Sequence, residues 1–273
     1  MMKKSIRLLL IIFFVAIVSV NGYQLFEIAR QYVGEIHVKA ELEKFRPVLP
    51  KTKHSPIYNL TNLALESIIN INNNYKTLNN MPNLINTTEK QLNKNITALQ
   101  NEVNKDVAGW LTIPNTNVDY PFVLSKDNDY YLRRDIFRNY ATAGTLFMDF
   151  RCVKDFSDFN TIIYGHNMKN GSMFSDLEKY ADPLFFESNS PGFIFLDTNT
   201  YELKIIAYMI VRADDKIIYN PLIDRSLFFE YVKNNADNFR EPNADGNIIT
   251  LSTCTNNYKD TRIVVIGEYN IHS

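Results

Sequence analysis

Residues 248–254 read IITLSTC and residues 262–269 read RIVVIGEY, two mainly apolar runs that flank the polar stretch TNNYKDT. Runs of this length, rich in β-branched residues and bounded by polar ones, are typical of buried strands. Two such strands joined by a short polar connection favour a hairpin. Cys254 ends the first strand and Arg262 begins the second, so the hairpin would place these two residues opposite each other at its mouth.

Six further runs upstream have the short apolar or alternating pattern of strands, and short helical patterns interrupt them. The strand patterns lie at 110–113, 118–124, 145–150, 161–164, 193–196 and 201–211. The helical patterns lie at 129–134, 173–180 and 226–239. Eight strands with few crossover helices predict a mostly antiparallel β-barrel or β-sandwich around one core.

The composition excludes several classes of protein. The chain has 273 residues with 29 Lys+Arg against 30 Asp+Glu, so a broad basic surface is not expected and nucleic acid is not a predicted partner. Its 45% of hydrophobic residues is ordinary for a globular protein. Two Cys exclude a disulfide-rich scaffold and a four-Cys zinc site, and nine Gly make glycine-rich phosphate loops scarce.

The N-terminus predicts a single membrane anchor. Lys3, Lys4 and Arg7 precede the apolar run 8–20, which can be extended to Phe26. No small-x-small cleavage site follows, which favours an uncleaved signal anchor over a cleaved signal peptide. A buried core helix is disfavoured because nothing polar interrupts the first part of the run. The basic flank would stay in the cytoplasm, with the rest of the chain outside.

Two helical patterns follow the anchor. Apolar residues at helical spacing from Leu25 to Ala40 predict a stalk, or a helix that packs on the domain behind it, ending near Pro47. The segment 59–104 is rich in Asn, and Ile85, Leu92 and Leu99 recur at seven-residue steps. This repeat favours a long amphipathic helix of coiled-coil type.

Three residues form a candidate acyl-transfer site. Cys254 lies at a strand end, where a substrate can reach its thiol, but a thiol needs a nearby cation or base to become a strong nucleophile. Arg262 is permanently charged and could donate to an oxyanion. His166 follows the strand 161–164 in the run NTIIYGHNM, whereas no sheet positions the other three His. Taken singly, each has a simpler interpretation as a core thiol, a solvated loop residue or a surface charge; together they fit a nucleophile, an acid/base and an oxyanion donor.

These motifs resemble those of the sortases. TLSTC and RIVVIGEY, with Arg262 after the Cys, look like the sortase signature, and YGHNMKNGSMF around His166 is similar to class B in particular. So are DVAGWLTIPNTNVDYPFV, NDYYLRRD and GTLFMDFR, and the resemblance covers residues 106–269 in order. It implies a closed eight-stranded sortase barrel with peripheral helices. The domains would then be 1–26 for the cytoplasmic tip and anchor, 27–104 for the helical stalk and Asn-rich segment, and 105–273 for the catalytic domain.

The resemblance also implies a function: a membrane-bound transpeptidase on the surface of a Gram-positive bacterium. Cys254 would attack a backbone carbonyl in the C-terminal sorting signal, of Pro-x-Thr type, of a secreted protein. Arg262 would stabilise the oxyanion, and His166 would protonate the leaving amine. An amine of a cell-wall precursor would then resolve the thioacyl-enzyme and attach the protein to peptidoglycan. No metal or organic cofactor is implied.

Four residues are candidates for contact with the peptide. Ser252 and Thr253 flank the nucleophile, and Ser252 is favoured because side chains two apart share a face of a strand. Tyr219, between the sixth strand and the following helix, and Leu124, at the end of its strand, are weaker groove candidates by resemblance. Cys152 is interpreted as an unpaired, partly buried thiol, since a disulfide to Cys254 would inactivate the enzyme.

Three alternatives remain open on the sequence. A papain-like protease has its Cys upstream of its His, which is the reverse of the order here. A sortase that polymerises pilins, with a Lys side chain as the acceptor, would use the same site residues. A membrane-tethered binding module without catalysis would have no reason to activate Cys254.

Overall fold

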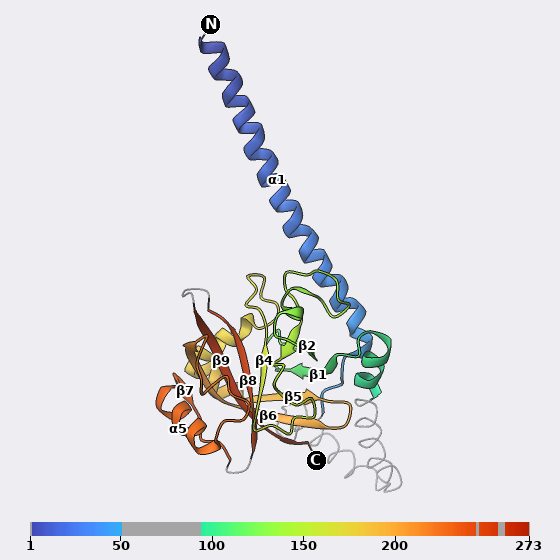
Figure 1. The fold of residues 1–273 in the computed structure, drawn as a ribbon, viewed down its shortest axis with the longest axis vertical. Coiled ribbons are helices and arrows are strands. Elements are labelled where there is room, and N and C mark those ends of the chain that lie inside the picture. Colours follow the sequence, from blue (N-terminus) through green and yellow to red (C-terminus); the bar gives the residue numbers. More distant parts are fainter. Residues whose placement is uncertain (1, 51–93, 244–245, 256–259, 273) are drawn as a thin grey trace, which may run out of the picture.

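The computed structural model describes residues 2–50, 94–243, 246–255 and 260–272. Helix α1 (Met2–Leu42) continues into the short 3-10 helix η1 (Glu43–Phe45) and projects away from the rest of the molecule (Figure 1). At about 1.5 Å per residue, its 41 residues span roughly 60 Å. The predicted anchor and stalk thus lie on one continuous helix. Across the described ranges, no helix has both the length and the apolar character needed to cross a membrane.

Eight strands close into a barrel. They follow the order β5-β1-β2-β3-β4-β8-β9-β6, and the pairing of β6 with β5 completes the ring. The pairs β2–β3 and β4–β8 are parallel, and the others are antiparallel. The strands are β1 (Val107–Thr112), β2 (Asp119–Leu124), β3 (Leu146–Met148), β4 (Asn160–Tyr164), β5 (Pro191–Phe195), β6 (Thr200–Arg212), β8 (Asn247–Cys254) and β9 (Thr261–Ile271). Each of the eight runs predicted from the sequence overlaps one of these strands, so the predicted barrel is confirmed.

The prediction of a helix over 226–239 is wrong at its C-terminal end. Helix α5 (Arg225–Asn235) begins after Asp224, whose side chain accepts a hydrogen bond from the Leu227 amide. It stops before β7 (Asn238–Phe239), which pairs with β6 and adds a ninth strand outside the ring. Pairing with the edge of β6 therefore overrides helical spacing in these last residues.

Three short helices cover the connections between strands. The 3-10 helices η3 (Tyr130–Arg133) and η4 (Ser175–Ala181) lie where helical patterns were predicted. Helix α4 (Pro183–Ser188) was not predicted, although Asp182 before it accepts a hydrogen bond from the Leu184 amide. An Asp cap followed by Pro at the first helical position is a recognisable helix start.

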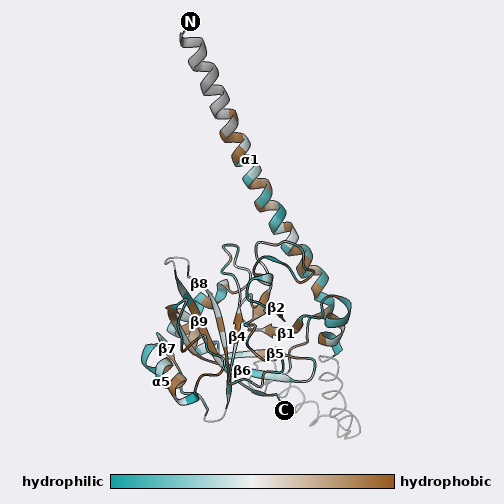
Figure 2. Ribbon diagram, in the orientation of Figure 1, coloured by the Kyte–Doolittle hydropathy of each residue, from teal (hydrophilic) through white to brown (hydrophobic). Residues whose placement is uncertain are grey.

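Three clusters of buried apolar side chains stabilise the fold. One fills the barrel, and another lies beneath α5 against the outside of β6, β8 and β9. The remaining cluster packs the end of α1 and a helix at 94–102 against β1 and β5, and it includes Leu42, Phe45, Ile96, Leu99 and Trp110. Figure 2 shows hydrophobic residues along the strands of the barrel and in bands on the described part of α1.

The end of the Asn-rich segment therefore contributes to the cluster that packs against β1 and β5. Ile96 and Leu99 have no exposed surface, and Asn104 donates hydrogen bonds of 2.8 Å to the Tyr131 hydroxyl and to the Ile136 carbonyl. Residues 51–93, with most of the predicted coiled-coil helix, lie outside the described residues. The domain boundary at 104/105 stays a prediction.

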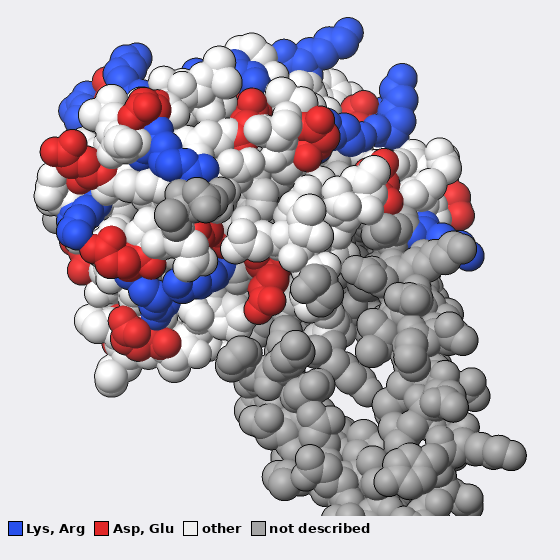
Figure 3. Space-filling model, turned by 90° about the horizontal axis from the view of Figure 1, so that it is seen from below, with Lys and Arg blue, Asp and Glu red and all other residues white. Residues whose placement is uncertain are grey.

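Charged side chains are interspersed on the surface. Figure 3, a view from below, shows Lys and Arg among Asp and Glu on that face, with no large area of one sign. This agrees with the nearly balanced charge of the chain, 29 basic against 30 acidic residues.

Candidate active site

The hairpin predicted from the sequence is formed by β8 and β9. Their antiparallel register pairs Cys254 directly with Arg262. Cys254 is exposed at the end of β8, and Arg262 is half-buried at the start of β9. The Arg262 guanidinium donates a hydrogen bond of 2.9 Å to the Thr261 carbonyl, which leaves other N–H groups for an incoming anion.

The parallel pairing of β4 with β8 brings His166 to the same end of the sheet. Tyr164 lies opposite Ser252 in the register, and the Gly165 amide donates to the Ser252 carbonyl at 3.1 Å. Immediately after His166, the side-chain amide of Asn167 donates to the Cys254 carbonyl at 3.0 Å. The loop that carries His166 is therefore hydrogen-bonded directly to Cys254.

A backbone carbonyl orients the imidazole of His166. Its Nε2 lies 2.7 Å from the Leu132 carbonyl in η3. Because a carbonyl only accepts, this contact assigns a proton to Nε2, so Nδ1 is the nitrogen that can gain or lose a proton. The ring is held in one tautomer, as a proton-transfer group requires.

Close packing explains why a glycine precedes His166. A Cβ at Gly165 would lie 2.5 Å from Leu146 Cδ2 and 2.7 Å from the Phe174 ring. The Phe174 amide in turn donates to the His166 carbonyl at 2.9 Å, which closes the loop 166–174 on itself. A glycine is therefore required directly before His166, because a side chain at position 165 would clash where β4 leads into the site.

Tyr219 and Ser252 form a polar contact beside the thiol. Their hydroxyl oxygens lie 2.9 Å apart, and Ser252 is two residues from Cys254 on the same strand. Burial raises the pKa of Tyr219 to about 12, although the hydrogen bond to Ser252 and the charge of Arg262 act in the opposite direction. The tyrosine therefore stays protonated at neutral pH and can donate a hydrogen bond.

The other two candidates for peptide contact have different surroundings. Thr253 is 3% exposed, and among the described residues its hydroxyl has no hydrogen-bond partner. Leu124 is half-buried at the end of β2, where it pairs with Met148 of β3 and packs on the barrel core. The roles of Thr253 and Leu124 in peptide contact stay predictions.

Both cysteines are free thiols in very different environments. Cys152 is 4% exposed, and burial raises the pKa of its thiol to about 12, whereas Cys254 is exposed. Only Cys254 is accessible to a peptide. In the part of the chain that the structure describes, no three His, Cys, Asp or Glu side chains gather as metal ligands. The expectation that no metal or cofactor takes part stays a prediction.

A closed barrel with an exposed thiol facing a guanidinium, and a histidine on the adjoining loop, is the arrangement of a cysteine acyltransferase. A family model for the sortase domain matches residues 111–270, more than half of the chain. Sortase B of Listeria monocytogenes is 41% identical over 176 residues, covering 61% of this chain and 71% of that relative. The chain belongs to the sortase family of cysteine transpeptidases.

Within this family the chain falls in class B. A Streptococcus pyogenes class B sortase involved in pilus biogenesis is 30% identical with a TM-score of 0.58, covering 61% of this chain and 93% of that structure. A Staphylococcus aureus sortase B in complex with substrate is 28% identical with a TM-score of 0.61, covering 66% and 87%. Sortases act on sorting-signal proteins and cell-wall precursors at the surface of Gram-positive bacteria.

The sequence did not single out several residues that orient the site. Asn167 is one, and the pair of buried Asp149 and partly exposed Arg151, which contacts the Tyr219 carbonyl, is another. The only signal was the DFR triplet within GTLFMDFR, an acidic and a basic residue two apart directly after a buried strand. Spacing alone did not indicate what they contact.

Proposed function

We propose that Cys254, His166 and Arg262 carry the transpeptidation of this class B sortase. The Cys254 thiolate attacks a backbone carbonyl of the sorting signal, and the Arg262 guanidinium stabilises the tetrahedral oxyanion. Imidazolium His166 then gives its proton to the leaving amine as the peptide bond breaks. The thioacyl-enzyme is resolved by an acceptor amine, which forms a new amide bond, loses a proton and returns the thiol. The register pair Cys254–Arg262 is the observation that carries this proposal.

The reaction needs the thiol and the imidazole in opposite protonation states. The competent form is the Cys254 thiolate with the His166 imidazolium, because the thiolate is the nucleophile and the imidazolium is the acid. The contact of His166 with the Leu132 carbonyl at 2.7 Å leaves the second ring nitrogen for the exchanged proton. The hydrogen bond from the Asn167 side chain to the Cys254 carbonyl supports a short separation between the His166 loop and the thiol.

We infer that the substrates are secreted proteins with a C-terminal Pro-x-Thr type sorting signal, and that α1 tethers the enzyme to the membrane as a single-pass anchor. The support for the tether is the basic flank at Lys3, Lys4 and Arg7, the apolar run 8–20 and the projection of α1 from the barrel (Figure 1). Apolar side chains such as Leu25 and Ile28 remain exposed on this helix. The catalytic domain then faces the cell wall.

Intact-mass analysis of the full chain tests the chemistry. The enzyme is incubated with a panel of Pro-x-Thr peptides, with and without an acceptor amine, beside Cys254→Ala and the control Cys152→Ala. We expect an acyl adduct or cleavage that depends on Cys254, survives in Cys152→Ala and turns into ligation when amine is added. A folded enzyme that gives no adduct with any peptide would contradict the proposal and favour a binding module.

A pilin acceptor is the second candidate. The similarity to the Streptococcus pyogenes class B sortase involved in pilus biogenesis favours it. The same assay separates the two acceptors when one arm contains a peptide with a free N-terminal amine and the other a peptide whose only amine is a Lys side chain. Ligation to the first alone supports attachment to the cell wall, and ligation to the second supports polymerisation.

A further inference from the structure

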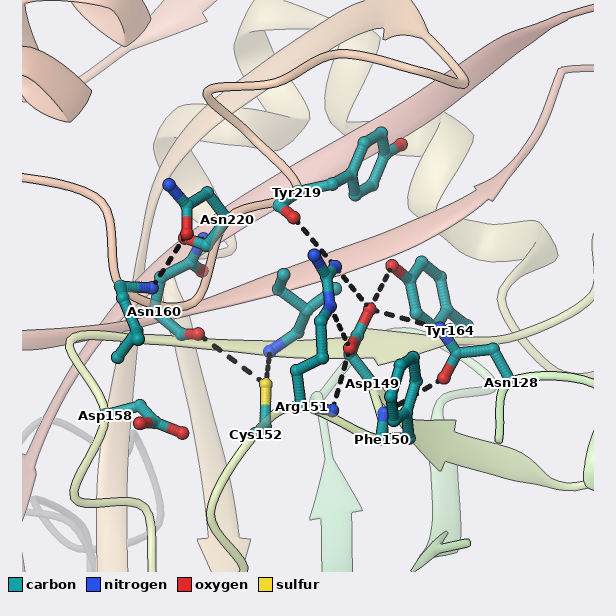
Figure 4. A network of polar contacts seen from close by, with 12 residues as sticks. Asn128, Asp149, Phe150, Arg151, Cys152, Asp158, Asn160, Tyr164, Tyr219 and Asn220 are labelled. Atoms are coloured by element: carbon teal, nitrogen blue, oxygen red, sulfur yellow. Dashed lines mark hydrogen bonds and ion pairs between the residues drawn. The ribbon is translucent and has the colours of Figure 1, made fainter. Parts of the chain in front are cut away.

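The connection between β6 and α5, which carries Tyr219, is held by side chains from the turn that follows β3 and from the first residue of β4. Three consecutive carbonyls, those of Ile218, Tyr219 and Asn220, accept hydrogen bonds there. Figure 4 shows the contacts at Tyr219 and Asn220. Asn160 Nδ2 donates to the Ile218 carbonyl at 2.9 Å and to the Asn220 carbonyl at 3.2 Å. Arg151 Nη2 donates to the Tyr219 carbonyl at 2.8 Å. We name Asp149, Arg151 and Asn160 the carbonyl clamp.

Asp149 fixes the direction of the Arg151 guanidinium. The carboxylate is fully buried and accepts from Arg151 Nε and Nη2, each at 2.8 Å. Tyr164 and Asn128 also donate to it, at 2.9 and 3.1 Å. Burial acts to raise the pKa of Asp149, but the hydrogen bonds from Arg151 and Tyr164 outweigh it and hold the pKa below its ordinary value. A planar guanidinium bound at two points has one orientation, and here that orientation aims Nη2 at the Tyr219 carbonyl.

Asn160 is fixed in the same way. It is the first residue of β4 and fully buried, and its side-chain oxygen accepts from the Thr250 hydroxyl at 2.7 Å. This bond assigns the orientation of the amide, so its NH₂ group points to the carbonyls of Ile218 and Asn220. The backbone on both sides of Tyr219 is thereby attached to the rigid barrel.

The clamp determines where the Tyr219 side chain lies. With its backbone held, the ring lies 6.1 Å from the Tyr164 ring between centroids, and the hydroxyl meets Ser252 beside Cys254. We propose that the carbonyl clamp positions Tyr219 as a fixed wall of the peptide site, and that Arg151 is a positioning residue for recognition of the sorting peptide. This inference rests on the proposed function. Arg151 touches no reacting atom and acts through Tyr219.

Peptide kinetics of Arg151→Gln test the inference. Arg151 is partly exposed at 46%, so the fold should tolerate its change, and Arg30→Gln removes a matched arginine from an exposed ion pair on α1. We expect KM for the peptide to rise about tenfold with a smaller change in kcat. The reason is that a displaced Tyr219 side chain weakens peptide binding more than it affects the chemical step at Cys254. The rate of Cys254 alkylation by iodoacetamide should stay within about twofold of wild type. Arg151→Lys should not rescue KM, since one ammonium cannot reproduce the fork.

A double-mutant cycle with Tyr219→Ala, which removes the ring as well as the hydroxyl, separates positioning from a general loss of charge. If Arg151 acts through the Tyr219 side chain, Arg151→Gln should add little to the KM of Tyr219→Ala. Effects that simply multiply, or an Arg151→Gln variant with wild-type KM, would overturn the proposal.

Hydrogen exchange gives a readout that does not depend on turnover. In Arg151→Gln, amide exchange should accelerate in residues 213–224 and stay unchanged in β8 and β9, whereas Arg30→Gln should change neither. Unchanged exchange in 213–224 would contradict the clamp even if the wild-type enzyme ligates peptides. Faster exchange in an enzyme that processes no peptide would instead retain the clamp and refute the proposed function and the role in recognition.

Discussion

The Glu35 carboxylate on α1 accepts a hydrogen bond of 2.8 Å from the Asn170 side chain, in the loop that follows His166. The Ser172 hydroxyl donates to the same carboxylate at 3.1 Å. A cavity of about 340 Å³ lies beside these contacts, between α1 and the barrel. The helix that leads toward the N-terminus is therefore attached to the histidine loop by a small number of polar contacts.

Glu35→Ala should loosen this attachment. Removal of an acceptor shared by two donors should lower the free energy of unfolding by about 1 kcal/mol. Exchange of amides in the loop 166–174 should accelerate as well. Glu27→Ala is the control, because the Glu27 carboxylate pairs with Arg30 on the same helix and not with the histidine loop in the part of the chain that the structure describes. Equal behaviour of the two variants would show that α1 is not coupled to the loop.

Arg262→Lys should lower kcat/KM by about a hundredfold or more while the fold remains intact. An ammonium keeps the charge but not the planar set of N–H donors that an oxyanion uses, and loss of one oxyanion donor costs on the order of 10²–10³ in kcat. Arg212→Lys, on the adjacent strand β6 with a side chain that is 74% exposed, is the control. Near-normal turnover of Arg262→Lys would contradict the role of Arg262 in stabilising the oxyanion.

Ile96→Ala should destabilise the domain by about 2–5 kcal/mol, because the side chain is fully buried against the barrel. The same packing predicts that a chain starting at Lys105 unfolds at a lower temperature than one starting at Lys94. Chemical denaturation measures the first effect and thermal unfolding the second, with Lys94→Ala as an exposed control on the same helix. A wild-type midpoint for Ile96→Ala would mean that this helix does not belong to the folded unit.

The strands and the central hairpin could be predicted from the sequence because their signals are local. Apolar runs fix each strand, and a short polar connection fixes the pairing of Cys254 with Arg262. The carbonyl clamp could not be predicted from the sequence. Arg151 and Asn160 donate to carbonyls about 60 residues further along the chain, and only the folded barrel brings these groups together. The end of α5 was misplaced for a similar reason: whether Asn238 is helical or pairs with Tyr208 depends on the edge of β6.

Asp149 should make stability depend on acid pH. Its pKa in the folded protein lies below its ordinary value, so its contribution is fully present above the unfolded pKa of about 3.9 and is lost as pH falls through the lower folded pKa. Asp149→Asn should therefore lower stability most above about pH 4 and flatten the pH dependence below it. Unfolding curves between about pH 2 and 6 measure this, with Asp197→Asn as an exposed control. Parallel pH profiles for wild type and Asp149→Asn would contradict the ionised buried carboxylate.

Alkylation should distinguish the two thiols completely in the folded enzyme. Cys254 is exposed at a strand end, whereas Cys152 is 4% exposed and its sulfur accepts a hydrogen bond from the Ile162 amide at 3.4 Å. Burial raises the pKa of Cys152 to about 12, so almost none of it is thiolate at pH 8, and the thiolate is the reactive form. Iodoacetamide followed by peptide mass mapping should therefore give one modification, at Cys254, and a second at Cys152 only in denaturant. Cys254→Ala should leave the folded enzyme unlabelled. Labelling of Cys152 in that variant at a rate near that of a free thiol would mean that the 149–152 turn, and with it the Arg151 side of the carbonyl clamp, opens in solution.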